Sequence, residues 1–117
     1  MKQIKGILAD IDGTLYFKGS PISGTIEAVE KLRKKGIKLL FFTNTDSKSP
    51  RTVFNTLNEY GFSIKENEIF TPIIALKEFL EEYPDKKIYL VTTEEVKEEF
   101  QKYRQIKSSE VPDFVII

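Results

Sequence analysis

Short apolar runs alternate along the chain with longer segments in which apolar residues recur every three or four positions. Ile26, Val29 and Leu32 have the spacing of one helix face, and Gly36 follows where such a helix would end. The continuous apolar runs predict strands at 4–9, 37–42, 68–70, 87–91 and 113–117. This alternation predicts an α/β fold with a mainly parallel sheet and right-handed crossovers, and a helix that begins at Ser23.

Three further segments have helical patterns. Ser49 followed by Pro50 predicts an N-cap and the first residue of a helix. Residues 72–83 carry apolar residues at helical spacing and end at a Pro-Asp turn signal. Thr92 with Glu95 has the spacing of a capping box, which predicts that a fourth helix begins there.

Composition restricts the chemistry that this chain can perform. Eighteen basic residues balance eighteen acidic ones, which gives no electrostatic reason to expect a nucleic-acid or membrane partner. Cysteine and histidine are absent, so any acid–base or metal chemistry must rest on carboxylates. No apolar stretch approaches the roughly 18 residues that cross a bilayer, and the N-terminus lacks a secretion signal. We therefore expect a cytoplasmic protein.

Polar side chains follow two of the predicted strands. Asp10 and Asp12 come after the first strand, and Thr43 and Asn44 come after the second. Ligands of parallel α/β sheets bind at the carboxyl ends of the strands, so these residues are expected to face one crevice. Two neighbouring carboxylates repel unless a cation lies between them, and a set of oxygen ligands favours Mg²⁺. Gly13 allows a ligand to approach the backbone closely, so the group as a whole suits a phosphoryl ligand.

Both segments also have simpler interpretations. The sequence DIDGT is a common turn composition, because Asp and Gly favour turns. A Thr-Asn pair by itself is typical of a loop that follows a strand. Their positions after two separate buried strands favour a site.

These residues resemble motifs of a known family. DIDGTL at 10–15, after an apolar strand, resembles the nucleophile motif of haloacid dehalogenase-like hydrolases, and FFTNT at 41–45 resembles their second motif. The segment GFSIKENEIFTPIIAL resembles the subgroup that has a large α/β cap after the third core strand. That subgroup includes the N-acetylglucosamine-metabolism phosphatases, the 4-nitrophenylphosphatases and the phospholysine phosphohistidine phosphatase group. The resemblance implies an incomplete Rossmann-like sheet, with residues 1–72 as the N-terminal half of the core and residues 73–117 as the start of the cap.

The resemblance also implies a function and residue roles. The protein would be a Mg²⁺-dependent phosphatase that acts on a small phosphorylated substrate. Asp10 would be the nucleophile that forms an aspartyl phosphate, and it would also bind the metal. Asp12 would be the general acid–base, with its main-chain carbonyl on the metal. Thr43, Asn44 and Gly13 would bind the phosphate.

The sequence departs from the family pattern in what it lacks. The lysine of the third motif and the acidic pair of the fourth have no counterpart here, and Asp46 stands where relatives often carry a neutral residue. We therefore expect the chain to be the N-terminal part of a longer enzyme, cut within its cap. One alternative is a non-catalytic domain that binds a phosphate-bearing ligand or another protein. Another is that two short chains, or the chain and a separate partner, complete each other, with a homo-oligomer joined at the exposed sheet edge.

Overall fold

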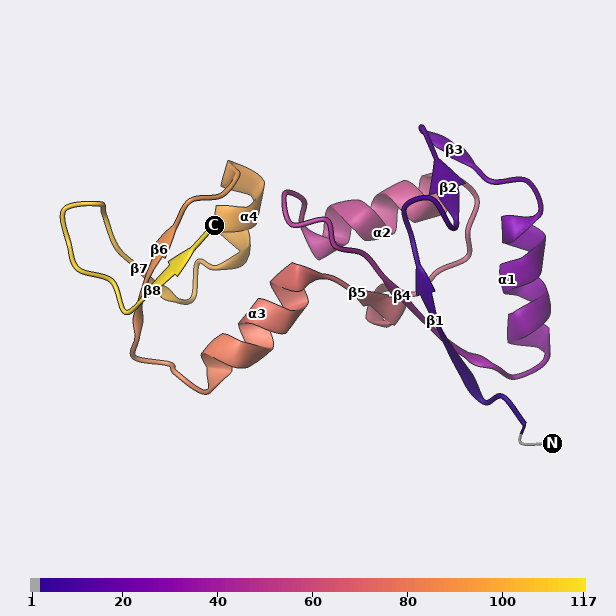
Figure 1. The fold of residues 1–117 in the computed structure, drawn as a ribbon, viewed down its shortest axis with the longest axis horizontal. Coiled ribbons are helices and arrows are strands. Elements are labelled where there is room, and N and C mark those ends of the chain that lie inside the picture. The colour runs from indigo at the N-terminus through magenta and orange to yellow at the C-terminus, as the bar shows by residue number, and fades with distance from the viewer. Residues whose placement is uncertain (1–2) are drawn as a thin grey trace. The chain divides into compact units, whose positions relative to one another are not determined.

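The computed structural model describes residues 3–117 and divides them into two compact units. The first unit contains the described residues up to Asn44 together with Pro50–Thr71. The second contains Thr45–Ser49 together with Pro72–Ile117. Figure 1 labels the elements of both units.

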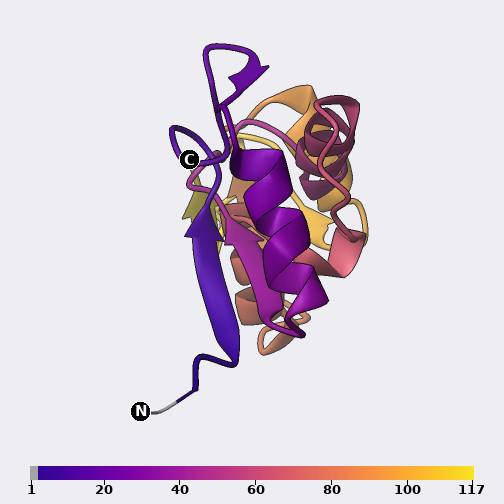
Figure 2. The same ribbon diagram turned by 90° about the vertical axis from the view of Figure 1, so that its right-hand side faces the viewer.

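A parallel three-stranded sheet forms the centre of the first unit. Its strands are β1 (Gly6–Asp10), β4 (Lys38–Phe42) and β5 (Ile69–Phe70), in the order β1-β4-β5. Asp10 is the register partner of Phe42, so β1 and β4 end side by side. The other elements are the hairpin β2 (Tyr16–Phe17) and β3 (Ser20–Pro21), α1 (Thr25–Lys34), α2 (Pro50–Glu59) and the 3₁₀ turn η1 (Glu66–Glu68). Figure 2 shows α1 in front of β1 and β4.

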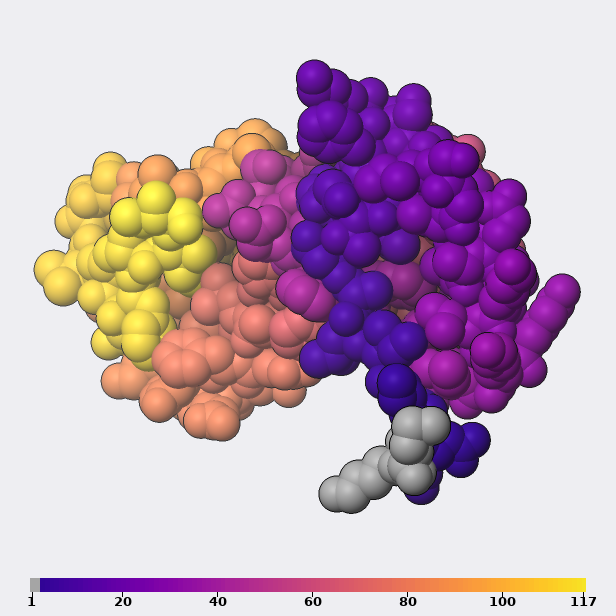
Figure 3. Space-filling model, turned by 45° about the vertical axis from the view of Figure 1, so that its right-hand side comes forward, coloured from indigo at the N-terminus to yellow at the C-terminus, as the bar shows by residue number. Residues whose placement is uncertain are grey.

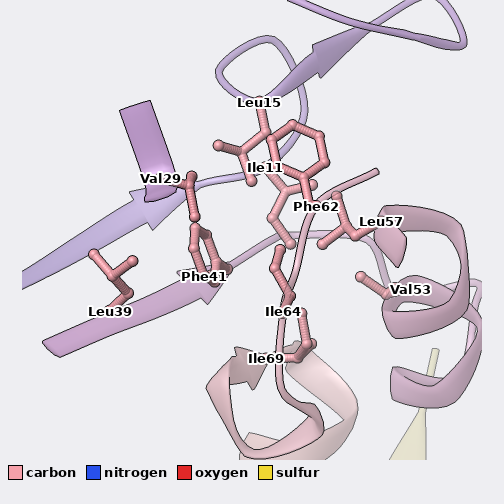
Figure 4. Packing of buried hydrophobic residues seen from close by; sticks show 10 residues of the cluster. All are labelled: Ile11, Leu15, Val29, Leu39, Phe41, Val53, Leu57, Phe62, Ile64 and Ile69. Atoms are coloured by element: carbon pink, nitrogen blue, oxygen red, sulfur yellow. The ribbon is translucent and has the colours of Figure 1, made fainter. Parts of the chain in front are cut away.

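The core of this unit lies on one face of the sheet. Alternate strand residues, such as Leu39 and Phe41, pack with Val29 of α1 and Leu57 of α2. Ten buried residues make up the cluster in Figure 4: Ile11, Leu15, Val29, Leu39, Phe41, Val53, Leu57, Phe62, Ile64 and Ile69. The opposite face is also apolar and carries Leu8, Leu40, Phe42 and Phe70 around a shallow hollow.

The second unit is a smaller α/β arrangement. It contains α3 (Pro72–Glu81), β6 (Lys87–Leu90), α4 (Glu94–Glu99), β7 (Arg104–Gln105) and β8 (Phe114–Ile116). Its strands are parallel in the order β7-β6-β8. The core consists of Ile73, Leu80, Ile88, Leu90, Val96 and Phe100. In the part of the chain that the structure describes, no helix is both long and apolar enough to span a membrane.

The α/β class and the mainly parallel pairing are confirmed, while two helix starts differ from the sequence-based predictions. The first helix begins at Thr25 rather than Ser23, because Gly24 takes a positive φ of 85° at the N-cap. The N-cap of α4 is Thr93 rather than Thr92, since Thr93 has an extended backbone and accepts a hydrogen bond from Val96 N.

The expected capping box between Thr92 and Glu95 is also wrong, because the N-cap of α4 is Thr93. The Glu95 carboxylate accepts a hydrogen bond from the Ser49 backbone N–H at 2.8 Å. This hydrogen bond connects Glu95 of α4 to the segment Thr45–Ser49 within the second unit.

Three short strands, β2, β3 and β7, were not predicted from the sequence. Each has only two residues, too few for a visible periodic pattern.

Candidate active site

The ends of β1 and β4 bring Asp12 and Thr43 together. Thr43 Oγ1 donates a hydrogen bond to Asp12 Oδ2 at 2.9 Å. Thr43 is buried, and its backbone N–H donates to Phe70 O at 3.2 Å, which ties it to the neighbouring strand as well. The backbone contact with Phe70 therefore holds Thr43 beside β5, and its hydroxyl in turn contacts the Asp12 carboxylate.

Ile11 anchors the segment between the two carboxylates. Its side chain is only 1% exposed and packs in the core, whereas Asp10 is partly buried and Asp12 is exposed. Asp10 and Asp12 flank this anchored residue, and both are less buried than Ile11. Apolar anchoring of Ile11 thus positions both acids at the sheet edge.

The residues after Asp12 form a turn. Gly13 has a φ of 79°, a left-handed conformation that disfavours side chains, and its N–H donates to Tyr16 O at 2.8 Å. Leu15 N donates to Ile11 O at 2.9 Å, and the Leu15 side chain is buried. The turn interpretation of this segment is therefore confirmed, and the site interpretation stays a prediction. A contact between Gly13 and phosphate stays a prediction.

Tyr16 pairs with Asp12 through an isolated β-bridge, and the sequence analysis did not identify it. Burial, followed by the interaction of its hydroxyl with the nearby Asp12 carboxylate, raises the pKa of Tyr16 to about 12. The ring packs against Tyr60, with ring centroids 5.2 Å apart. The only signal in the sequence was an aromatic residue closely following DIDGT, and that signal is equally typical of a core residue.

Asn44 and Asp46 are the remaining residues that the sequence analysis singled out. Asn44 is exposed directly after Thr43, and its predicted role in orienting phosphate stays a prediction. Asp46 belongs to the second unit, where it lines a largely apolar cavity of about 360 Å³ together with Thr92 and Thr93.

The donors around the turn are of the type that a hard cation requires. Asp10 and Asp12 offer carboxylate oxygens and main-chain carbonyls, which suit Mg²⁺ better than a soft metal. Among residues 3–117, no group of three or more Asp, Glu, His or Cys side chains could hold a metal ion. The donor chemistry therefore fits magnesium, and these two residues would supply part of a coordination shell.

A parallel α/β sheet with two acids at its carboxyl edge is the arrangement that the sequence motifs predicted. The model of the haloacid dehalogenase-like hydrolases matches residues 7–105, and the chain belongs to this family.

Individual relatives extend the comparison. The 5'-nucleotidase YutF of Bacillus subtilis is 29% identical over 118 aligned positions, which cover 100% of this chain and 46% of that protein. The p-nitrophenyl phosphatase from Archaeoglobus fulgidus superposes with a TM-score of 0.86 at 27% identity, over 97% of this chain and 44% of that one. A glycerol phosphate phosphatase from Mycobacterium tuberculosis, solved in complex with magnesium, gives a TM-score of 0.83 at 27% identity, over 98% and 37%. The chain thus spans less than half the length of each of these proteins.

Proposed function

We propose that the protein is a Mg²⁺-dependent phosphatase that hydrolyses a phosphomonoester through an aspartyl phosphate on Asp10. The observation that carries this proposal is the hydrogen bond from Thr43 to Asp12, at the point where β1 and β4 end side by side. Family membership and the phosphatase names of the relatives support the same reaction class. The substrate is a small phosphorylated molecule.

The reaction has two displacements. An Asp10 carboxylate oxygen forms a bond to phosphorus while the bond to the leaving oxygen breaks, and Asp12 gives a proton to that oxygen. Asp12 then takes a proton from a water molecule, which attacks the aspartyl phosphate. Inorganic phosphate leaves and the Asp10 carboxylate is regenerated. Splitting the hydrolysis in this way replaces one difficult step by two easier ones.

The metal and the polar residues stabilise charge during these steps. The Asp10 carboxylate and the Asp12 main-chain carbonyl would hold Mg²⁺, which offsets the repulsion between a carboxylate and a phosphoryl group. Thr43, Asn44 and Gly13 would contact the phosphoryl oxygens. A hydroxyl has one proton, so Thr43 donates either to Asp12 or to a phosphoryl oxygen, and substrate binding would release Asp12 from Thr43.

The two units support the assignment of domains. We propose that residues 1–72 form the N-terminal half of a hydrolase core and that residues 73–117 begin a cap. The division at Thr71 and Pro72 agrees with this boundary, apart from Thr45–Ser49, which groups with the second unit. The cytoplasmic location expected from the sequence stays a prediction.

The nucleophile can be tested on the whole product of the gene that carries this sequence. We expect Mg²⁺-dependent phosphate release from 4-nitrophenyl phosphate, a mass increase of one phosphoryl group after rapid quenching, and loss of both in Asp10→Asn. The matched control is Asp85→Asn, which removes an exposed carboxylate in the turn between α3 and β6. Retained turnover in Asp10→Asn would place the nucleophile elsewhere.

A second candidate is a non-catalytic domain that binds a phosphate-bearing ligand. It is favoured by the small number of acidic metal ligands, since the described residues contain no cluster of three. Calorimetry of the 117-residue chain with Mg²⁺ and inorganic phosphate separates the two candidates. Binding without turnover, in this chain and in the whole gene product, would favour the binding domain.

A further inference from the structure

The cavity of about 360 Å³ in the second unit lies at the carboxyl ends of β6 and β8. Val91 and Thr92 follow β6, and Ile116 ends β8. Ligands of open α/β sheets bind outside the carboxyl ends of the strands, and this sheet is a different one from that of the candidate active site. We propose that the cavity binds a small organic ammonium ion with an apolar body, held by the Asp46 carboxylate. Binding there is independent of the proposed phosphatase activity.

The walls of the cavity are mainly apolar. Side chains from α3, α4 and β8 contribute to them: Ile73, Leu76, Val96 and Ile116. The backbone N–H of Val91 donates to Ile116 O at 2.8 Å, which fixes the position of this fifth apolar residue at the sheet edge. A cavity of this size, with apolar walls and a few polar groups, is typical of a small-molecule site. The ligand therefore needs an apolar body.

The rim of the cavity is open to solvent. Asp46 is exposed, and Val91 is 52% exposed. The C-terminal segment, drawn in yellow in Figure 3, lies at the surface as well. A small ligand can therefore enter without displacing a buried side chain.

Asp46 is the only charged side chain among the described residues that line the cavity. Within residues 3–117 its carboxylate forms no hydrogen bond or ion pair. The start of α3 at Pro72 also lies at the cavity, and a helix N-terminus favours anions. That helix end is equivalent to about half a charge, whereas the carboxylate carries a full one. The balance of charge therefore favours a cationic ligand.

The hydroxyl groups at the cavity also favour a ligand that donates hydrogen bonds. Thr93 Oγ1 donates its proton to Ser47 O at 3.0 Å, and Thr92 Oγ1 donates to Thr93 O at 3.3 Å. Neither threonine has a second hydroxyl proton for a ligand, while the Ser47 hydroxyl can donate or accept. Acceptor atoms therefore predominate, which matches the N–H groups of an ammonium ion better than the oxygens of a carboxylate.

Three six-carbon probes that differ in their polar group test the charge preference. We expect calorimetry on the whole product of the gene, at pH 7, to show hexylammonium binding more tightly than hexanol, and hexanoate binding least. Asp46→Asn should weaken hexylammonium binding up to about fivefold, the range for an exposed charge pair, and should leave hexanol binding unchanged. The control Asp85→Asn removes an exposed carboxylate outside the cavity and should change no affinity. Tighter binding of hexanoate than of hexylammonium, or an unchanged hexylammonium affinity in Asp46→Asn, would overturn the proposal.

The apolar walls are tested by a second pair of variants. Val91→Ser should weaken the binding of both hexylammonium and hexanol, by about fourfold for each methylene contact that is lost. Val115→Ser is the matched control, because Val115 is 55% exposed in the same sheet and lies outside the cavity. Equal losses in the two variants, or no binding of any probe to the wild-type protein, would overturn the proposal. These measurements need no turnover, so a failure of the proposed phosphatase activity is a distinct outcome.

Discussion

The hydroxyl of Thr43 and the carboxylate of Asp12 form a hydrogen bond of 2.9 Å across 31 positions of sequence. The contact connects the end of β4 to the turn after β1, and it lies beside Asp10, whose register partner is Phe42. This one hydrogen bond therefore contributes to the stability of the sheet edge and also orients a residue of the proposed chemistry.

Thr43→Val removes this hydrogen bond and keeps the size and branching of the side chain. We expect the free energy of unfolding to fall by about 1 kcal/mol, the usual net contribution of one hydrogen bond. Thr43→Ser keeps the hydroxyl and should retain most phosphatase activity, whereas Thr43→Val should lose it. Urea unfolding and phosphate release measure the two effects, and equal activity losses in the two variants would rule out a role for the hydroxyl.

Gly13→Ala tests the turn that follows the two acids. Gly13 has a φ of 79°, and a left-handed residue with a Cβ costs roughly 1–2 kcal/mol. We expect a loss of this size in the free energy of unfolding, measured by urea denaturation. Gly6→Ala is the matched control, because the nearest atom that its Cβ would meet is Lys38 O at an ordinary 3.5 Å. A loss in Gly6→Ala equal to that in Gly13→Ala would show that the backbone conformation is not the cause.

The ion pair between Arg33 and Glu68 predicts a pH dependence of stability. Arg33 donates two hydrogen bonds to the Glu68 carboxylate, at 2.6 and 2.5 Å. The hydrogen bond from Arg33 holds the pKa of Glu68 below its usual value. A lowered pKa contributes stability above the unfolded pKa of about 4.3, and that contribution is lost as the pH falls through the folded pKa.

Glu68→Gln should therefore destabilise the protein at pH 7 by about 1–2 kcal/mol and should differ less from wild type near pH 3. Urea unfolding at the two pH values measures the difference. Glu66→Gln is the control, because Glu66 pairs with Arg51 at 2.8 Å while both side chains are more than half exposed. Exposed pairs contribute little, so this variant should resemble wild type at both pH values. A pH-independent effect of Glu68→Gln would contradict the argument.

Leu57→Ala tests the core that supports the sheet edge. Leu57 is fully buried among the residues of Figure 4, and such a truncation typically costs about 2–5 kcal/mol. Leu8→Ala removes the same atoms from a side chain that is 71% exposed on the opposite face, and it should change stability by less than about 0.5 kcal/mol. Thermal unfolding of the two variants compares the faces. Similar losses would indicate that the Leu8 face is covered in solution.

The sequence by itself determined the order of the helices and the longer strands and the kind of chemistry available. Periodicity is a local property, so the segments around Val29, Leu39 and Leu57 were assigned without knowledge of their partners. The absence of histidine and cysteine limited the chemistry to carboxylates, and the motif around Asp10 indicated the family that the comparison confirmed.

Only the tertiary structure decided which of these residues meet. The contact between Thr43 and Asp12 depends on the register of β1 against β4, and no local pattern encodes that register. The pairing of Tyr16 with Asp12 and the packing of its ring against Tyr60 depend on a turn and on burial, neither of which has a distinctive sequence signal. Helix and strand assignments were accessible because they depend on neighbours along the chain. The polar contacts of the site were not, because they depend on strand pairing and burial between segments far apart in sequence.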